Sequence, residues 1–547
     1  MLRYGKLRRM DQALEVPAGP PVSTAASVEP GLARSASLLG LGNTASSVLG
    51  LIRDTIISHL FGSSGALSAY NLAYRVPSLL YDLLVGGMLS AALVPVFSDY
   101  TRPERRGELA RLASAVLSLF AIVLGAVMVL VEVFARPLAG LLGNFADPAL
   151  QDVLTSSLRF IAPVILLMGL SGGVVGLLYA LKRFSYTAIA ATAVNLGTVV
   201  VAPLLVHRLG IAVLPLGLMA GSAGQLLIML PALRGVHIRP TLAWNHPGLR
   251  AMGRLYVPIA LGLVINEFQV VIDGRWASAT GPHSVAWMGY ASKLIQFPLG
   301  LVPVAVSLAA LPSLSQRAAA ADWDSFRHIF ARGLRLVLVL MIPATIGLWA
   351  LAEPVIRLLF EHGAFQPQDT LMTAQALRLY LVGLMFAGVD YLLNYTFYAR
   401  QDSRTPAIVG VAAVGAYFVA ALLLKPRFGF LGLVFADSVK QATHACTMTV
   451  LLVRSVGRPR GERIQQTAAR SAIVALAMGL GVWWLAQELT ALLPVGLVSR
   501  LLVVTLTAGL GVVFYAGVLY RLGVPEVGSL VNRLAWRPQA KGQSPEI

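Results

Sequence analysis

The stretch that decides the fold runs from Asn43 to Tyr100 and reads NTASSVLGLIRDTIISHLFGSSGALSAYNLAYRVPSLLYDLLVGGMLSAALVPVFSDY. Two long apolar segments are joined by a short glycine and serine turn at 62–65. Inside these segments lie four ionisable residues, Arg53, Asp54, Arg75 and Asp82. A charge in the hydrocarbon core costs about 3 kcal/mol on insertion scales, so lipid would not tolerate four of them. We therefore predict that both segments are membrane-spanning helices that form walls of a polar central chamber.

The composition is that of a polytopic membrane protein. Of the 547 residues, 57% are hydrophobic and 12% are charged, and the mean hydropathy is +0.73; soluble domains carry about 25% charged residues. The one cysteine, Cys446, excludes a disulfide framework, and no His/Cys/acid spacing indicates a metal site. No P-loop is present, so ATP hydrolysis is not indicated. Basic loops of a membrane protein account for the net charge of +18, so we expect no nucleic-acid partner.

Apolar stretches long enough to cross a bilayer recur along the whole chain. We count fourteen and predict an all-α, polytopic integral membrane protein. The predicted spans are 35–60, 66–98, 109–134, 152–181, 186–207, 211–233, 249–278, 284–314, 327–351, 370–399, 404–424, 429–454, 466–489 and 497–521.

The distribution of Lys and Arg predicts the orientation. With a cytoplasmic N-terminus, the cytoplasmic segments carry 30 of the 43 basic residues, and the opposite side with its span ends carries nine. Basic residues concentrate on the cytoplasmic side of membrane proteins, so we predict that both termini are cytoplasmic. Residues 1–34 are predicted to be a disordered cytoplasmic tail, because a basic start is followed by a Pro/Ala/Ser stretch.

An internal repeat divides the spans. The segment Ser90–Pro95 recurs as Ser307–Pro312 at an offset of 217, and the pattern of Leu178–Ile189 recurs at Phe397–Ile408 at an offset of 219. Six spans fit into this offset, so both copies have the same orientation, as in repeats related by an axis along the membrane normal. We predict two pseudo-symmetric six-helix lobes with a substrate path between them. Their predicted limits are 35–233 and 249–454, followed by two C-terminal helices at 466–521 and a cytoplasmic tail at 522–547.

Eight motifs are distributed along the spans. They are Val48–Asp54, Phe61–Gly62, Arg75–Leu80, Val94–Tyr100, Tyr290–Pro298, Leu311–Ser315, Leu359–Phe365 and Tyr398–Pro406. Together these motifs are specific, and they resemble those of the MurJ/MviN family. The resemblance covers roughly residues 35–520.

The resemblance implies a function. Members are fourteen-span flippases in the superfamily of the multidrug exporters. They move lipid II, the undecaprenyl-pyrophosphate-linked peptidoglycan precursor, from the inner to the outer leaflet of the bacterial cytoplasmic (inner) membrane. A hydrated chamber with cationic side chains suits a pyrophosphate, which Arg binds in bidentate geometry. Two rocking lobes would expose it to each side in turn while the isoprenoid tail stays in lipid, so we expect no catalytic nucleophile.

The chain departs from the family pattern at chamber positions. In the first two spans, Ser47 stands where family members usually have arginine, Ser68 where they have aspartate, Tyr81–Asp82 where they have a basic pair, and Gly86 where they have an acidic residue. In the eighth span, Lys293 replaces the usual arginine and Gln296 replaces an acidic residue. The chamber therefore has fewer cations than is usual, which suggests an altered substrate or a lost transport role.

Four residues are candidates for contacting the head group: Arg53, Lys293, Arg75 and Asp54. For Arg53 and Asp54 the alternative is a structural pair, although adjacent helical residues point about 100° apart and should not face each other. Arg75 has the alternative of snorkelling to the outer interface. Lys293 is a lone ammonium within a span, so it needs a ligand or a carboxylate partner. Asp82 could be that partner, and an ion pair of the two inside the chamber would be a gate and not a substrate site.

The second lobe offers candidates for a coupling ion. Asp390 and Asn394 are four residues apart on one predicted span, so one helical face presents both oxygens. Together with Asp273 they are candidates for binding sodium or a proton that drives transport. The alternative is that these side chains form structural hydrogen bonds. The membrane potential is the other candidate driving force. Asp437 and Lys440 are expected to form an internal ion pair, and His444 to be a packing residue. We expect no cofactor and no metal site.

Two other functions stay open. One is an ion-coupled exporter of small amphipathic solutes, of the multidrug type. The other is a transport-silent homologue that scaffolds envelope synthesis and binds cell-wall synthases.

Overall fold

The computed structural model describes residues 30–83, 92–242, 244–459 and 461–528. Within these ranges every regular element is helical. The α-helices are α1 (Pro30–Phe61), α2 (Gly65–Tyr81), α3 (Val94–Asp99), α4 (Arg106–Val133), α5 (Ala135–Leu142), α6 (Pro148–Ala180), α7 (Phe184–Leu209), α8 (Val213–Met229), α9 (Pro247–Ser278), α10 (Ser284–Ala319), α11 (Trp323–Ala350), α12 (Ala352–Leu359), α13 (Pro367–Ala399), α14 (Arg404–Phe428), α15 (Phe430–Val456), α16 (Ile464–Leu492) and α17 (Leu497–Arg521).

Local sequence sets several helix ends. The Ser64 side chain accepts a hydrogen bond from the Leu67 amide at the start of α2, and Asp147 does the same for Ala149 at the start of α6. A side-chain oxygen at this position satisfies an amide that has no partner within the helix. α13 begins with a reciprocal capping box between Gln366 and Asp369.

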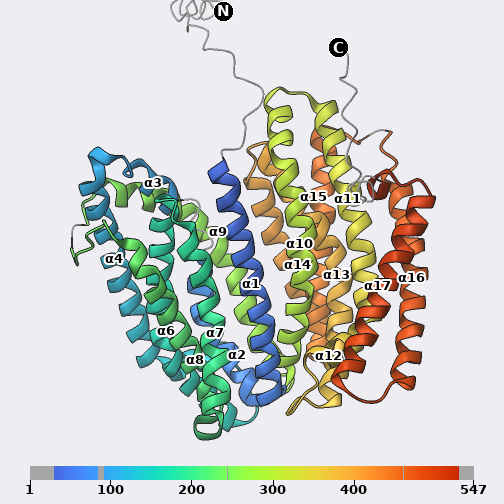
Figure 1. The fold of residues 1–547 in the computed structure, drawn as a ribbon, viewed down its shortest axis with the longest axis horizontal. Coiled ribbons are helices and arrows are strands. Elements are labelled where there is room, and N and C mark those ends of the chain that lie inside the picture. Colours follow the sequence, from blue (N-terminus) through green and yellow to red (C-terminus); the bar gives the residue numbers. More distant parts are fainter. Residues whose placement is uncertain (1–29, 84–91, 243, 460, 529–547) are drawn as a thin grey trace, which may run out of the picture.

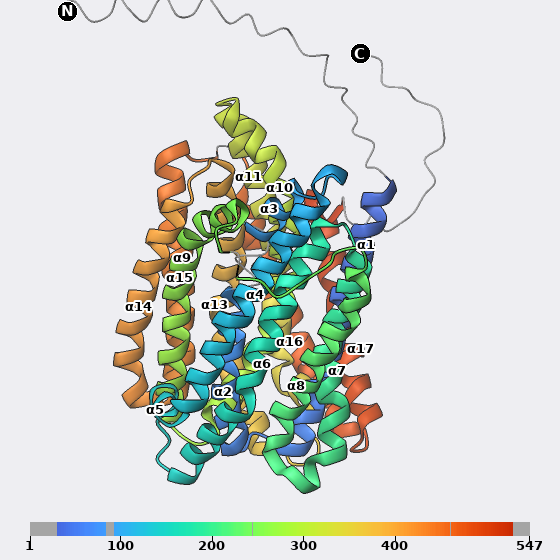
Figure 2. The ribbon, with the colours of Figure 1, turned by 90° about the vertical axis from the view of Figure 1, so that its left-hand side faces the viewer.

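The long helices pack mainly in two groups that lie side by side (Figure 1). The first group contains α1, α2 and α4–α8, and the second contains α10–α15 with α16 and α17 on its outer side. Helix α9 contacts members of both groups, and α2 contacts α10 across the boundary. α1 begins and α17 ends at the same end of the molecule, which we call the proximal end, and α12 lies at the opposite, distal end (Figure 1). The start of α1 at the proximal end is also visible in Figure 2.

Two short helices repeat at the offset found in the sequence. Ala135 and Ala352, the first residues of α5 and α12, are 217 positions apart, and both helices have eight residues. Gly210 and Gly429, the C-caps of α7 and α14, are 219 positions apart and have φ values of 55° and 58°. Short helices and glycine caps that recur at offsets of 217 and 219 residues are consistent with the predicted repeat.

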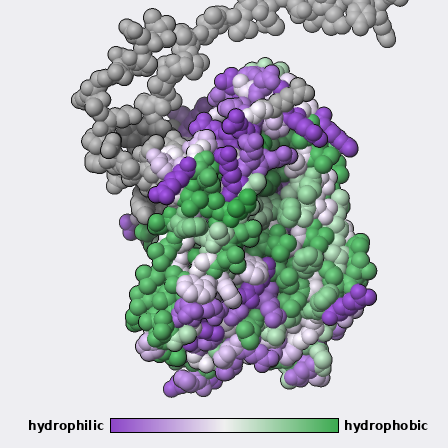
Figure 3. Space-filling model, turned by 90° about the vertical axis from the view of Figure 1, so that its right-hand side faces the viewer, coloured by the Kyte–Doolittle hydropathy of each residue, from purple (hydrophilic) through white to green (hydrophobic). Residues whose placement is uncertain are grey.

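The surface is suited to a membrane. In the described part of the chain, nine helical stretches have the length and hydropathy to cross a bilayer. Helices α1, α9 and α15 are not among the nine, and they carry charged side chains such as Asp54, Asp273 and Asp437 within their length. Figure 3 shows hydrophobic side chains over much of one face, with polar ones gathered toward the two ends. The molecule is an all-α, multi-pass membrane protein, and the total of fourteen spans stays a prediction.

The structure differs from three of the predicted boundaries. The span 66–98 is not one described helix, because α2 ends at Tyr81, α3 begins at Val94 and 84–91 lie outside the described residues. Residues 30–34, predicted to be tail, belong to α1. Part of the predicted C-terminal tail is also ordered, because Val524 and Val527 are buried and Glu526 pairs with Arg335. The remaining tail predictions, for 1–29 and 529–547, lie outside the described residues.

Candidate functional site

A central chamber lies where the two groups of helices meet. Its volume is about 320 Å³, and its walls come from α1, α2, α7, α8 and α10. All the charged residues among its described lining residues are ones that the sequence singled out: Arg53, Asp54, Arg75 and Lys293. Three cations against one carboxylate leave the chamber with a net charge of +2.

One carboxylate holds two of these cations. Asp54 is 5% exposed, and its Oδ1 accepts hydrogen bonds from Nε and a terminal nitrogen of Arg53 at 3.0 and 2.9 Å. The Lys293 ammonium on α10 lies 2.8 Å from the same oxygen. The Lys293 side chain is 38% exposed, so a ligand can reach it. The cluster therefore links α1 of the first group to α10 of the second.

Two expectations about these charges were wrong. Arg53 and Asp54 do contact each other, because the long arginine side chain folds back along α1 until its guanidinium reaches the shorter carboxylate. Lys293 pairs with Asp54 and not with Asp82. Asp82 is exposed at the C-terminal end of α2, so the expected gate pair between Asp82 and Lys293 is not formed.

The sequence analysis missed Asn195 on α7. Its Oδ1 accepts a hydrogen bond from Arg53 at 2.9 Å, while its own Nδ2 donates to the Ser46 carbonyl at 3.0 Å. Arg53 is therefore oriented from two sides, by Asp54 and by Asn195. The signal in the sequence was an amide side chain alone in the apolar run 188–206.

Arg75 lines the chamber and does not snorkel away from it. Its guanidinium donates to the carbonyl oxygen of Val270 on α9. A Cβ added to Gly274, one turn further along α9, would lie 2.9 Å from the same guanidinium. Arg75 thus joins α2 to α9, the helix that contacts both groups.

The chamber is closed at the distal end by contacts between the groups. The turn between α1 and α2 packs against α10 and the start of α13: Tyr290 donates to the Gly62 carbonyl at 3.0 Å, and Ser63 donates to Asp369 at 2.5 Å. Trp287 donates to the same Asp369 oxygen at 3.0 Å. The bonds made by Gly62 and Ser63 join segments more than 200 residues apart in sequence, whereas the bond from Trp287 orients Asp369 within the second group.

The positions that depart from the family pattern have different surroundings. Ser68 is buried, and its hydroxyl accepts a hydrogen bond from the Ala286 amide at 3.2 Å, so it helps to join α2 to α10. Gln296 lines the chamber, and Ser47 is exposed on α1. Tyr81 is the last residue of α2, and Gly86 lies outside the described residues.

Of the coupling-ion candidates, Asp390 and Asn394 lie in the second group and Asp273 lies on α9; none of the three is among the described residues that line the chamber. Asp273 on α9 accepts a hydrogen bond from the Tyr417 hydroxyl at 2.5 Å. Asp390 and Asn394 share one helical face, as predicted, and their side chains are 2.8 Å apart. The other oxygen of Asp390 contacts His444 Nδ1 at 2.5 Å, and His444 Nε2 lies 3.3 Å from the carbonyl of Pro406. Both ring nitrogens of His444 thus have hydrogen-bonding partners, as expected for a satisfied side chain.

A second charged pair lies nearby on α15. The Lys440 ammonium is 2.6 Å from Asp437, which confirms the predicted ion pair, and it donates to Gln269 on α9 at 3.1 Å. Among the residues that the structure describes, no group of three or more His, Cys, Asp or Glu side chains is arranged to hold a metal ion.

Comparison with known proteins places the chain in a family. The sequence model described as "Lipid II flippase MurJ" matches residues 57–504. The chain belongs to the MurJ lipid II flippase family. A Vibrio cholerae relative, "Probable lipid II flippase MurJ", is 29% identical over 517 residues, which cover 90% of this chain and 96% of the relative. A Burkholderia cenocepacia relative, "Lipid II flippase MurJ", is 29% identical over 427 residues, with coverages of 76% and 82%.

Solved structures share the fold of this MurJ family member. "Lipid II flippase MurJ, inward closed conformation" matches with a TM-score of 0.72 at 22% identity, over 88% of this chain and 100% of that one. An inward-facing multidrug resistance MATE transporter of the MOP superfamily matches with a TM-score of 0.64 at 13% identity, over 79% and 99%. The predicted fold class is therefore confirmed.

Proposed function

We propose that this MurJ family member moves lipid II from the inner to the outer leaflet by alternating access. The observation that carries the proposal is the chamber with a net charge of +2, in which Arg53, Arg75 and Lys293 line one cavity. A pyrophosphate must leave water to cross hydrocarbon, and charge-assisted hydrogen bonds from these groups replace its hydration. Although the chain departs from the family pattern at several positions, the three chamber cations Arg53, Arg75 and Lys293 are present.

Asp54 acts as the internal counter-ion of two chamber cations. While no lipid is bound, its carboxylate compensates Arg53 and Lys293, which would otherwise repel each other. An arriving pyrophosphate offers more acceptor oxygens than one carboxylate and competes for the same donors. The ligand thereby replaces the contact between α1 and α10. It biases the equilibrium between the two arrangements of the lobes, one open to each side of the membrane.

The distal contacts describe one of the two states of this cycle. Ser63, Tyr290 and Asp369 join the groups at the distal end, which is extracytoplasmic in the orientation that we propose. Release of the head group on that side requires these bonds to break. We place the protein in the inner membrane with both termini cytoplasmic, and we regard cell-wall synthases as candidate partners.

Two driving forces are compatible with the second group. We favour proton coupling through Asp390 and His444 over sodium binding, because both ring nitrogens of His444 face acceptors and the Asp390 oxygens are occupied by His444 and Asn394. Asp273 remains a candidate for the same role. The membrane potential acting on the chamber cations is the alternative.

Complementation tests the proposal. Cells depleted of their resident lipid II flippase should grow when the protein is expressed, and Arg53→Ala and Lys293→Ala should each abolish that rescue. The control is Arg427→Ala, which removes an exposed cation at the end of α14, away from the chamber. Growth with both chamber variants would contradict the pyrophosphate mechanism.

The rival functions give different results in the same cells. Drug resistance without rescue would indicate an exporter of small amphipathic solutes, and retained binding to cell-wall synthases without transport would indicate a scaffold. Mass spectrometry of lipids that co-purify with the protein identifies the cargo directly, and an undecaprenyl-pyrophosphate lipid is the expected result.

A further inference from the structure

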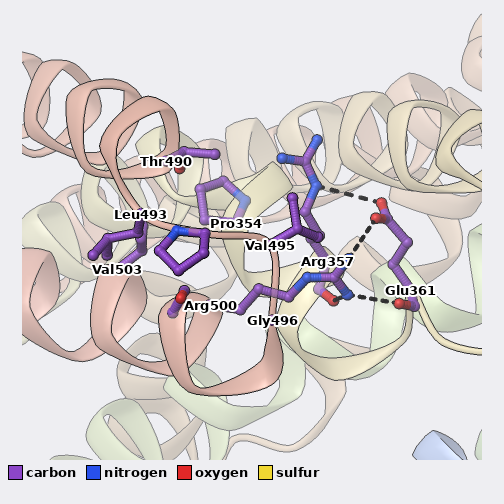
Figure 4. Close-up of a pocket in the computed structure, with 11 residues that line it drawn as sticks. Pro354, Arg357, Glu361, Thr490, Leu493, Val495, Gly496, Arg500 and Val503 are labelled. Carbon is purple, nitrogen blue, oxygen red and sulfur yellow. Dashed lines mark hydrogen bonds and ion pairs between the residues drawn. The ribbon is translucent and has the colours of Figure 1, made fainter.

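A second cavity lies at the distal end, outside the central chamber. Its volume is about 230 Å³, and it is formed by α12 and by the turn between α16 and α17 (Figure 4). None of its lining residues also lines the central chamber. The proposed transport path therefore leaves this cavity unused.

The cavity contains one carboxylate and two guanidinium groups. Glu361 accepts hydrogen bonds from Arg500 at 3.1 Å and from Thr370 at 2.6 Å, so both of its oxygens are occupied. Arg500 also donates to the backbone carbonyls of Arg357 and Glu361 at 3.1 and 2.7 Å. These bonds fix α17 to the C-terminal end of α12, where carbonyl groups lack helical partners. Arg500 and Glu361 thus compensate each other and serve the fold.

Arg357 is left with most of its hydrogen-bonding capacity. Its Nε lies 3.4 Å from Glu361, which is a long contact. Its two terminal nitrogens have no hydrogen-bond partner in the described part of the chain, and Figure 4 shows them directed away from Glu361. The side chain is 35% exposed. One positive charge at the cavity is therefore uncompensated and accessible.

The turn beside this charge is apolar and exposed. Val495, Leu492 and Val498 are 95%, 77% and 71% exposed. Exposed apolar residues continue along the same two helices, for example at Leu480 on α16 and Leu501 on α17. These helices cross the bilayer, so the apolar turn is an extension of a lipid-facing surface. A cation at the edge of such a surface lies where the phosphates of lipids meet their acyl chains.

We propose that this cavity binds the phosphate of an anionic phospholipid in the leaflet at the distal end. Arg357 donates two parallel hydrogen bonds to the phosphate oxygens, and Ser499 and Thr490 lie at the cavity wall within the same site. The acyl chains lie against Val495, Val498 and the exposed faces of α16 and α17. The bound lipid neutralises the charge of Arg357 at the junction of α12 and α17, and it holds α16 and α17 in place.

Photo-cross-linking tests the site with the full-length protein in nanodiscs. The probe is phosphatidylglycerol with a diazirine in its acyl chain, and the cross-linked peptides are mapped by mass spectrometry. Labelling of residues 489–503 should exceed that obtained with a phosphatidylcholine probe, and Arg357→Gln should lower it about tenfold, the loss expected for one charge-assisted hydrogen-bonding group. Arg357→Lys should retain part of it, and Arg427→Gln, which removes an exposed distal cation elsewhere, should not change it.

The outcomes separate the alternatives. Equal labelling by both lipids, or equal loss in Arg357→Gln and Arg427→Gln, would overturn the site. Complete displacement of the probe by millimolar inorganic phosphate would show that the cavity recognises a free anion without any contribution from the acyl chains, and would overturn the assignment to a lipid. An unchanged thermal unfolding profile of Arg357→Gln in detergent without lipid shows that the variant is folded. Should that variant unfold, Val495→Asp, which alters only the exposed turn, must reduce labelling for the proposal to stand.

Discussion

At the scale of single residues, the chamber depends on the one carboxylate that opposes its cations. Asp54 touches both Arg53 and Lys293, so its loss leaves two positive groups close together with no counter-ion between them. Removing one partner of a buried ion pair costs about 3–5 kcal/mol, and partial exposure of Lys293 reduces this figure. We predict that Asp54→Asn lowers the thermal unfolding temperature and abolishes rescue of flippase-depleted cells.

Asp82→Asn is the matched control for this change. Asp82 is also an acidic residue of the first two spans, but it is exposed and has no ion-pair partner in the described part of the chain. Thermal unfolding of the purified variants should therefore show a decrease for Asp54→Asn and little change for Asp82→Asn. Equal effects of the two would show that the ion cluster is not important for stability.

The chamber residues could be predicted from the sequence, but their contacts could not. Arg53, Asp54 and Arg75 are conspicuous because charges within apolar spans require a polar interior. Which carboxylate meets Lys293 depends on how α1 and α10 cross, and the spacing of residues within one helix carries no information on that. Asn195 was missed for the same reason, because its role comes from the packing of α7 against α1.

At the scale of elements, the turn between α1 and α2 depends on glycine. Gly62 has a φ of +58°, and a Cβ there would lie 2.4 Å from the carbonyl oxygen of Ala364. Gly210 has a φ of +55°, but a Cβ there would meet nothing within 4 Å. An L-residue in this conformation costs about 1–2 kcal/mol at both sites. Only Gly62→Ala should also push the turn away from the loop before α13.

The two variants can be compared in a background with Cys446→Ser and Ser63→Cys. Ser63 is 2% exposed in the closed arrangement, so a thiol at this position should react slowly with a maleimide. We predict faster labelling in Gly62→Ala and unchanged labelling in Gly210→Ala. Similar rates in both would mean that close packing at Gly62 does not hold the distal end closed.

The existence of the elements followed from the sequence, whereas some of their ends did not. Apolar length and the offset of about 217 residues predicted the helices and their repetition in two halves. The predicted spans do not include the short helices α5 and α12, because eight residues are too few for a hydropathy signal. Residues 524–528 were assigned to a tail, although Glu526 is bound by Arg335, a contact that only tertiary packing creates.

At the scale of the whole molecule, alternating access requires the two groups of helices to separate at the distal end. The hydrogen bond from Ser63 to Asp369 crosses this boundary, with 2.5 Å between Oγ and Oδ1. It joins the α1–α2 turn to the start of α13, which belong to different halves of the predicted repeat. A covalent link at this point would hold the distal end closed without touching the chamber.

We predict that Ser63→Cys with Asp369→Cys, in a Cys446→Ser background, forms a disulfide that blocks rescue and that reduction restores it. The physical reason is that a bond across the boundary prevents the distal end from opening, while Arg53, Lys293 and Arg75 stay in place to bind the head group. Growth is measured with and without a membrane-permeant reductant, and cross-linking is followed by gel mobility after proteolysis between the halves. Each single-cysteine variant is the control and should rescue under both conditions. Full rescue by the oxidised double variant would show that transport proceeds without separation of Ser63 from Asp369, and a rocking motion of the two halves about the chamber would then be excluded.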